Sequence, residues 1–257
     1  MSTLSRNIQA ETYKLKRTPI LWLSLIGGTM VAGVVFLVFY LNGANPPEAG
    51  VNPWKSFFNM SYTIASTLVL VPFIILVTSS LTQFEHSNSA WKQLYSFPIS
   101  RGSVFFSKGI TVFGLIALTY VVFMISIFPV AYLLSIYTPD YGFQDYAPVF
   151  GPLFKLFFHS FISILGVTAF QYWLCYRWKT FMAPIGIGML GFIIGPLLLS
   201  KPKIAIFLPH CHPIWYVKGL DHAITRFGLT TPEVYSLVFF VLFVALGYFQ
   251  ETRRNID

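Results

Sequence analysis

The sequence predicts an all-α polytopic membrane protein with six transmembrane helices and with both termini cytoplasmic. Three observations predict this fold class: charged residues are scarce, uncharged stretches are long, and basic residues gather in short segments on one side. Of 257 residues, 17 are Lys or Arg and 9 are Asp or Glu, which is 10% of the chain, against about 25% in soluble domains. The abundance of aliphatic and aromatic residues also excludes a disordered chain.

The spans follow from uncharged runs that are 17 to 31 residues long. A helix needs about 20 apolar residues to cross the hydrocarbon layer. A helix pairs its backbone N–H and C=O groups internally, which is necessary because lipid offers them no hydrogen-bond partners. Pro129 is expected to kink the third span near its far end. We place the six spans at Ile20–Leu41, Ile64–Gln83, Val104–Leu134, Leu153–Cys175, Phe181–Leu199 and Val234–Phe249.

The basic residues set the orientation, because cytoplasmic loops carry an excess of Lys and Arg. With the N-terminus inside, 11 of the 17 basic residues fall in cytoplasmic segments. Six crossings then return the C-terminus to the same side. We therefore expect one transmembrane domain, 1–257, with an elbow helix at 1–19, a cytoplasmic coupling loop at 84–103 and an outer loop at 200–233 containing re-entrant helices.

The segment before the first span, Thr3–Thr18, reads as an amphipathic interfacial helix. Its apolar stripe consists of Leu4, Ile8 and Leu15, and its polar face carries Arg6, Glu11, Lys14 and Arg17. Such a helix lies among lipid headgroups with its basic residues toward anionic lipid. The alternative is a basic flank that only satisfies the orientation rule.

Between the second and third spans lies a segment with its own helical pattern. Ser87 or Asn88 can cap a short helix that must end before Pro98. Its exposed ridge consists of Trp91, Leu94 and Tyr95, spaced i, i+3 and i+4. Such a ridge either docks against a partner or lies on the membrane surface.

This segment resembles the intracellular coupling helix of ABC-2 type transporter permeases, in particular the small permeases of lantibiotic and bacitracin self-protection. The residues that carry the resemblance are Glu85, His86, Trp91, Lys92, Pro98, Ile99, Ser100, Arg101 and Lys108. The N-terminal residues Glu11, Lys14, Arg17 and Pro19 are similar to the elbow helix of that family, and Asn52-Pro53-Trp54 matches its first outer loop. The outer loop 200–233 shows no family pattern.

The resemblance implies a partner and a site. The coupling helix would insert into a groove of a separate cytosolic ATP-binding subunit, which holds ATP and Mg, and a second permease copy, like or unlike, would complete the translocation path. No cofactor is expected on this chain. The residues expected at the ATP-binding subunit are Glu85, His86, Trp91, Lys92, Leu94, Tyr95 and Arg101.

The remaining motifs do not predict a catalytic, nucleotide or metal site. Gly186–Gly191 satisfies GxGxxG but lies inside a span, so helix packing through Gly191 and Gly195 is expected rather than a dinucleotide site. The sequence contains no Walker A motif. His210-Cys211-His212 admits a metal site, although an aromatic-lined interfacial loop fits better and we expect no metal. His159 and Gln171 lie inside a span and either line a pathway or, for His159, reach headgroups.

Together these features predict a multi-pass permease subunit in the cell membrane that exports or expels an amphipathic substrate, a peptide antibiotic or a lipid. No Asp, Glu, Lys or Arg falls in the middle of a predicted span, which argues against a proton-driven antiporter. The chain is therefore expected to be no enzyme, with the bilayer and the ATPase as partners and no nucleic acid. The alternatives are a metal-dependent membrane enzyme and a non-energised, channel-like protein. A role in antibiotic immunity follows only from the resemblance.

Overall fold

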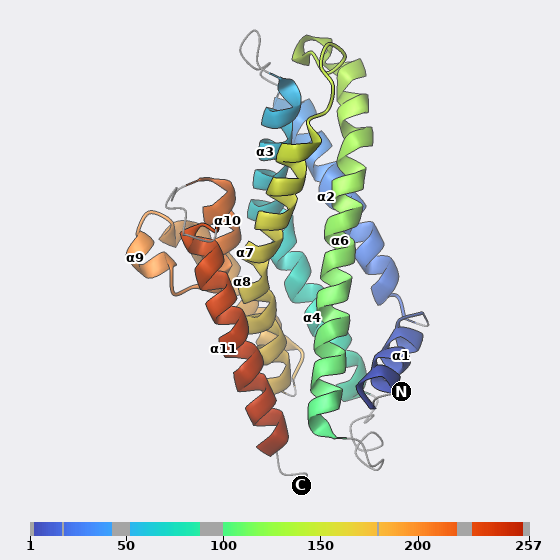
Figure 1. Cartoon of the computed structure of the whole chain (residues 1–257), viewed down its shortest axis with the longest axis vertical. Coiled ribbons are helices and arrows are strands. Elements are labelled where there is room, and N and C mark those ends of the chain that lie inside the picture. The colour runs from blue at the N-terminus through green and yellow to red at the C-terminus, as the bar shows by residue number, and fades with distance from the viewer. Residues whose placement is uncertain are drawn as a thin grey trace.

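A computed structural model of the chain describes residues 3–16, 18–42, 52–87, 100–178, 180–219 and 228–253, with the side chains of all but 42 and 83–87. These residues form helices joined by turns (Figure 1). The α-helices are α1 (Thr3–Lys16), α2 (Ile20–Asn42), α3 (Pro53–Ile64), α4 (Leu70–Ser87), α6 (Arg101–Tyr137), α7 (Phe150–Arg177), α8 (Met182–Leu198), α9 (Pro202–Ala205), α10 (His212–Val217) and α11 (Thr231–Arg253). A π-helical turn, η1 (Ala65–Val69), joins α3 to α4, and the 3-10 turns are η2 (Pro139–Tyr141) and η3 (Pro209–Cys211).

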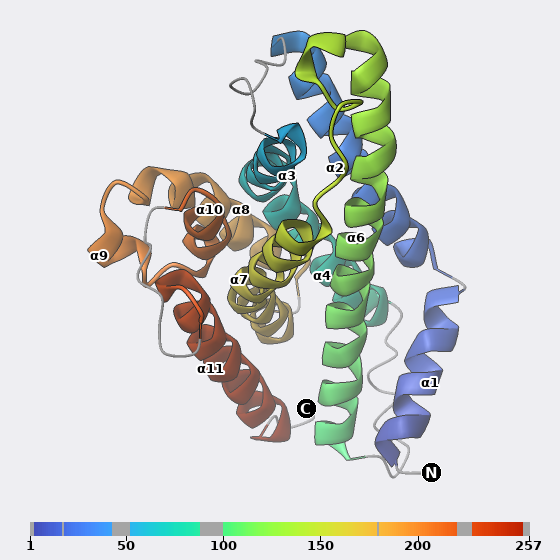
Figure 2. The same cartoon turned by 45° about the horizontal axis from the view of Figure 1, so that its top comes forward.

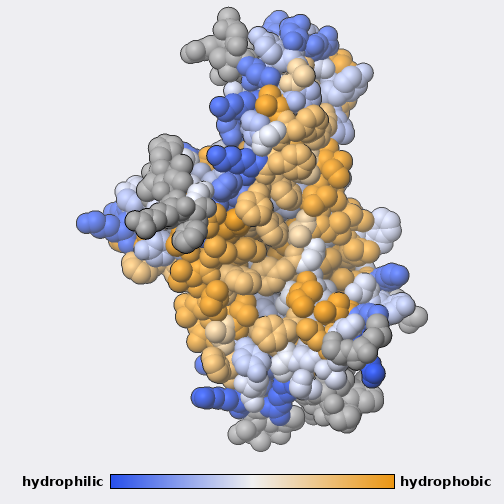
Figure 3. All heavy atoms as spheres, in the orientation of Figure 1, coloured by the Kyte–Doolittle hydropathy of each residue, from blue (hydrophilic) through white to orange (hydrophobic). Residues whose placement is uncertain are grey.

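The helices form a bundle in which α1 and the C-terminal end of α11 lie at the same end (Figures 1 and 2). We call this the terminal end and the opposite one, which carries η2, the far end. Among the described residues, five helical segments are long and apolar enough to cross a membrane. They are Ile20–Leu41, Pro53–Thr82, Arg101–Tyr137, Phe150–Arg177 and Thr231–Arg253. A wide hydrophobic band lies between hydrophilic ends (Figure 3), as expected for a multi-pass membrane protein.

The predicted fifth span corresponds to α8, a shorter apolar helix of 17 residues. Its length is about 25 Å at 1.5 Å per residue, just below the thickness of the hydrocarbon layer. The structure therefore gives five long spans and one helix at the lower limit. The third span, α6, runs as one helix through Pro129.

The second span begins earlier than predicted. The sequence placed its start at Ile64, whereas the helical path runs without interruption from Pro53 through η1 to Ser87. The reason is a cap: the Asn52 side chain accepts a hydrogen bond from the backbone N–H of Trp54 (3.0 Å), and Pro53 occupies the first helical turn. Lys55 ends the uncharged run on the N-terminal side, and the prediction therefore began the span after it. In the structure Lys55 lies within α3 as an exposed residue.

Small residues bring α7 and α11 close together. At Gly166 an added Cβ would lie 2.9 Å from the backbone oxygen of Ser236. The Ser236 hydroxyl accepts from the Gly166 N–H (2.9 Å) and donates to the carbonyl of Ile162 (2.8 Å). Close backbone approach at small residues, with hydroxyls bonded across the interface, is typical of helix packing in membranes.

Aromatic side chains fill the far end of the bundle. The Trp54 ring packs edge-on against Phe143 at 5.2 Å between ring centroids and lies 6.1 Å from Phe128. Its indole N–H donates to the carbonyl of Tyr146 (2.8 Å). This bond and the ring contacts hold the loop between α6 and α7 against the start of α3.

Two glycines of the GxGxxG sequence, Gly188 and Gly191, serve packing, whereas Gly186 is exposed and an added Cβ there would meet nothing within 4 Å. Gly188, Gly191 and Gly195 are buried in α8. An added Cβ at Gly191 would lie 2.5 Å from the ring of His210, and one at Gly195 would lie 3.4 Å from the His210 carbonyl. Gly191 and Gly195 therefore serve close packing, as predicted, although they face the η3 turn of the outer loop and not another long helix.

The α7–α11 contact yields a stability prediction. Replacing Gly166 with Ala forces Ser236 to move and is expected to lower the free energy of unfolding by about 1–3 kcal/mol. The matched control is Gly114→Ala in α6, where an added Cβ meets nothing within 4 Å and helix propensity raises stability by up to about 1 kcal/mol. Thermal unfolding in detergent measures both. Equal shifts for the two variants would contradict the close contact.

Candidate functional site

We call the predicted coupling loop, 84–103, the coupling segment. It leaves α4 and enters α6 at the terminal end of the bundle. Glu85 and His86 lie in the last turn of α4. Ser87 is the last residue of α4, which extends about a turn further than the apolar pattern suggested. The cap predicted at Ser87 or Asn88 belongs to a helix in the segment 88–99, outside the described residues, and stays a prediction. Arg101 is the first residue of α6, where the Ser100 hydroxyl accepts from the Ser103 N–H (3.4 Å).

Part of the predicted site lies outside the described residues. The segment 88–99 contains Trp91, Lys92, Leu94 and Tyr95, and their arrangement is not described. Their contact with an ATP-binding partner therefore stays a prediction, as does that of Glu85, His86 and Arg101. The described structure does place both ends of the segment at the terminal end of the bundle, beside α1 (Figure 1).

The predicted elbow helix exists as α1, but one of its faces differs from the prediction. Glu11 was expected on the polar outer face, yet it is buried, with 6% of its surface exposed. One carboxylate oxygen accepts from Lys14 Nζ at 2.9 Å and from Lys108 Nζ at 3.2 Å. Lys108 belongs to α6 and is also buried. Glu11 thus faces α6 and not the headgroups, because buried Lys108 needs a carboxylate partner.

A second polar contact joins the same two helices. The Asn7 amide donates to the Ser103 hydroxyl (2.9 Å) in the first turn of α6. Leu4, Ile8 and Leu15, the predicted apolar stripe, are half-buried. Arg17 lies outside the described residues, so its predicted role is untested. The elbow helix is therefore bonded to the start of α6 at two positions, through Asn7 and through Glu11.

Gln171 links three helices in the interior of the bundle. It is fully buried in α7. Its amide nitrogen donates to the Ser79 hydroxyl of α4 (3.2 Å) and to the carbonyl of Pro184 in α8 (3.0 Å). Its amide oxygen lies against Gly188, which has no side chain to displace it. The residue faces the bundle interior, while a pathway-lining role for it stays a prediction.

His159 pairs with a carboxylate that the sequence analysis did not single out. Its Nδ1 lies 2.6 Å from one carboxylate oxygen of Glu233, which is fully buried in the first turn of α11. The other carboxylate oxygen accepts from the backbone N–H and the hydroxyl of Thr230, each at 2.6 Å. The Tyr216 ring stacks on the imidazole at 5.9 Å. The sequence feature that could have identified Glu233 is the capping box Thr230-x-x-Glu233 at the start of α11.

His210 and His212, in the loop between α8 and α11, are buried rather than surface ligands. The His212 Nε2 is 3.0 Å from the carbonyl oxygen of Ile206, and the Cys211 thiol donates to the carbonyl of Gly195 at 3.4 Å. Burial lowers the pKa of His210 and of His212 to about 4, so both rings are neutral at pH 7. Among the described residues, no three His, Cys, Asp or Glu side chains converge as metal ligands would.

Comparison with known proteins identifies the class. The sequence profile of the ABC-2 family transporter proteins matches residues 7–195, which include most of α1, both ends of the coupling segment, α2 to α7 and most of α8. The chain therefore belongs to the ABC-2 transporter family: it is a membrane component of a transport system and is not itself catalytic. No curated protein matches the sequence. Permeases of this family generally work with an ATP-binding subunit.

The link between α1 and α6 can be tested by stability. Glu11→Gln removes the carboxylate from buried Lys108 and is expected to lower the free energy of unfolding by about 3–5 kcal/mol. Lys14 is 45% exposed at its side chain, so Lys14→Met, which removes the exposed partner, is expected to cost at most about 1 kcal/mol. Thermal unfolding in detergent compares them. A second-site Lys108→Met change should recover part of the Glu11→Gln loss, whereas additive losses would show that the two residues act independently.

Proposed function

We propose that this chain is the permease subunit of an ATP-driven ABC-2 type transporter that exports or expels an amphipathic substrate, a peptide antibiotic or a lipid. The observation that carries the proposal is the family match over residues 7–195, combined with the position of the coupling segment at the terminal end. A cytosolic ATP-binding subunit would supply ATP and Mg, and two permease copies, of like or unlike chains, would form the path.

In the proposed mechanism, ATP binding closes two ATP-binding subunits and draws the two coupling segments together. Trp91 anchors each segment in its partner, and Glu85, Lys92 and Arg101 fix its register. The described contacts support one further step: Lys108 holds Glu11 (3.2 Å), so the start of α6 and the elbow helix move as one unit. Bundle rearrangement would then switch the dimer between its two access states.

The orientation that we propose places the terminal end in the cytoplasm. Both ends of the described chain lie at the same end of the bundle (Figure 2), which supports an even number of crossings. Five long spans alone would separate the termini. We therefore infer that α8 is the sixth crossing in spite of its 17 residues.

The partner proposal is tested by co-purification of the ATPase from native membranes with tagged permease. Trp91→Ala is expected to reduce both the recovered ATPase subunit and its permease-dependent ATPase activity about ten-fold or more, because a buried aromatic anchor dominates such interfaces. The matched control is Tyr132→Ala, an aromatic residue of α6 that is 69% exposed in the membrane band. Equal recovery with the Trp91 and Tyr132 variants would overturn the assignment of the coupling segment.

The crossing number is tested by cysteine accessibility. Cys175 and Cys211 are both buried free thiols and are first replaced by alanine. Single cysteines are then placed at Ser5, Thr252 and Lys203 and treated with a membrane-impermeant thiol reagent on intact cells. Labelling of Lys203→Cys alone is expected, with the other two reacting only after permeabilisation. Labelling of exactly one of the two terminal positions on intact cells would show an odd number of crossings.

A further inference from the structure

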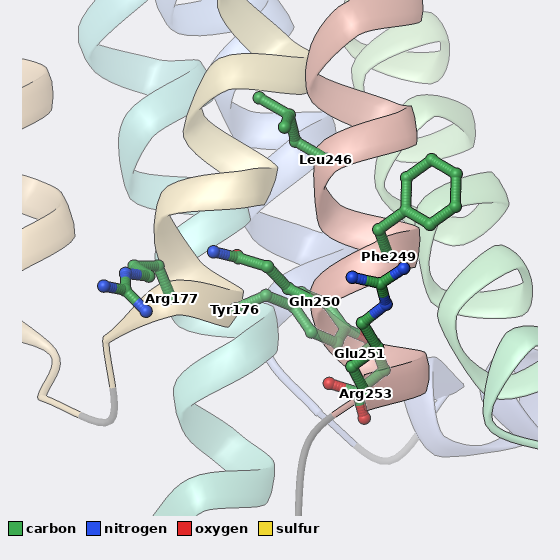
Figure 4. A pocket seen from close by; sticks show the side chains of 7 residues that line it. All are labelled: Tyr176, Arg177, Leu246, Phe249, Gln250, Glu251 and Arg253. Carbon is green, nitrogen blue, oxygen red and sulfur yellow. The ribbon is translucent and has the colours of Figure 1, made fainter.

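A cavity of about 420 Å³ opens at the terminal end of the bundle, between the last turns of α7 and α11 (Figure 4). Its volume falls within the range of roughly 300–1,000 Å³ that is usual for small-ligand sites. No described residue of the elbow helix or of the two ends of the coupling segment lines it.

Two arginines give the cavity its charge. Arg177 ends α7 and Arg253 ends α11, and in Figure 4 their side chains lie on opposite sides of the pocket. Both are exposed, and among the described residues neither forms an ion pair with a carboxylate. One acidic residue, Glu251, also lines the cavity but is buried, with 3% of its surface exposed. The lining therefore carries a net positive charge at its open side.

A neutral donor lies between the two arginines. The side-chain oxygen of Gln250 accepts a hydrogen bond from the indole N–H of Trp173 (3.0 Å). This bond fixes the orientation of the amide. The amide nitrogen of Gln250 is thereby left to donate to a ligand in the cavity.

The remaining wall is apolar and continues out of the cavity. Leu246 and Phe249 line it and are 40% and 55% exposed. Further along α11, Val238, Val241 and Leu242 are exposed on the same face, at the spacing of one helical stripe. Figure 3 shows that the surface over this part of the bundle is hydrophobic. An apolar track thus leads from the middle of the membrane band to the arginines.

We propose that this cavity binds one anionic phospholipid, with the phosphate at Arg177 and Arg253 and an acyl chain along the exposed face of α11. Guanidinium groups bind phosphate through paired, charge-assisted hydrogen bonds. The site lies where the apolar stretch of α11 ends, which is the level of the headgroups. A soluble anion would use the arginines alone and would leave the apolar track uncovered. The inference rests on membrane insertion and not on transport activity.

The test is native mass spectrometry of the purified full-length chain in detergent, titrated with phosphatidylglycerol or with phosphatidylcholine of the same acyl chains. The wild-type chain is expected to retain phosphatidylglycerol about ten-fold more strongly, as for a charge-assisted contact. The double variant Arg177→Gln, Arg253→Gln is expected to lose this preference. Phe249→Ser is expected to weaken retention of both lipids, because it interrupts the apolar track.

The matched control is Lys201→Gln, Lys203→Gln, which removes two exposed charges that do not line the cavity. It should retain the lipid preference, and all variants should unfold at nearly the wild-type temperature because their changed side chains are exposed. Equal loss in the control would show that general positive charge, and not the cavity, selects the lipid. Displacement of phosphatidylglycerol by millimolar inorganic phosphate, or no preference in the wild type, would overturn the proposal.

Discussion

A membrane-spanning bundle offers its buried polar groups no water, so the hydrogen bonds that satisfy them must come from within the chain. This constraint arranges the packing of the described helices. The Ser236 hydroxyl joins α11 to the backbone of α7 by bonding Gly166 and Ile162, and Gln171 joins α7 to α4 through Ser79. Apolar contacts alone allow one helix to slide along another, since lipid competes for the same surface. Polar bonds connect particular residues and therefore set the register of the bundle.

The longest helix, α6, gathers several of these links. Near its start Lys108 holds Glu11 of the elbow helix, and the carbonyl of Phe105 accepts from a buried tyrosine of α7 (2.6 Å). Two turns or more further on, the Thr119 hydroxyl donates to the carbonyl of Ser24 in α2 (3.2 Å). The helix that begins directly after the coupling segment is thus bonded to the elbow, to the first span and to the fourth. Displacing its start displaces those neighbours.

The sequence allowed the helical fold and the long spans to be predicted, because charges are excluded from hydrocarbon whatever the tertiary structure. It did not reveal the burial of Glu11, whose partner Lys108 lies 97 positions away. Amphipathic pattern alone assigned that carboxylate to the polar face, since a buried ion pair looks the same as a solvated charge in a helical projection. Glu233 was missed for the same reason, with His159 lying 74 positions away, although its local capping motif was readable.

The ion pair at the terminal end bears on how the proposed transporter would transmit motion. Ser100 caps α6, and Lys108 lies about 12 Å further along the helix, at 1.5 Å per residue. An ion pair this deeply buried is costly to break, because separation would leave charge in an apolar environment. When the start of α6 moves, the elbow helix must move with it, or the Lys108–Glu11 ion pair must break. In the transporter that we propose, a push on the coupling segment would therefore reach the headgroup layer through α1 and the bundle core through α6.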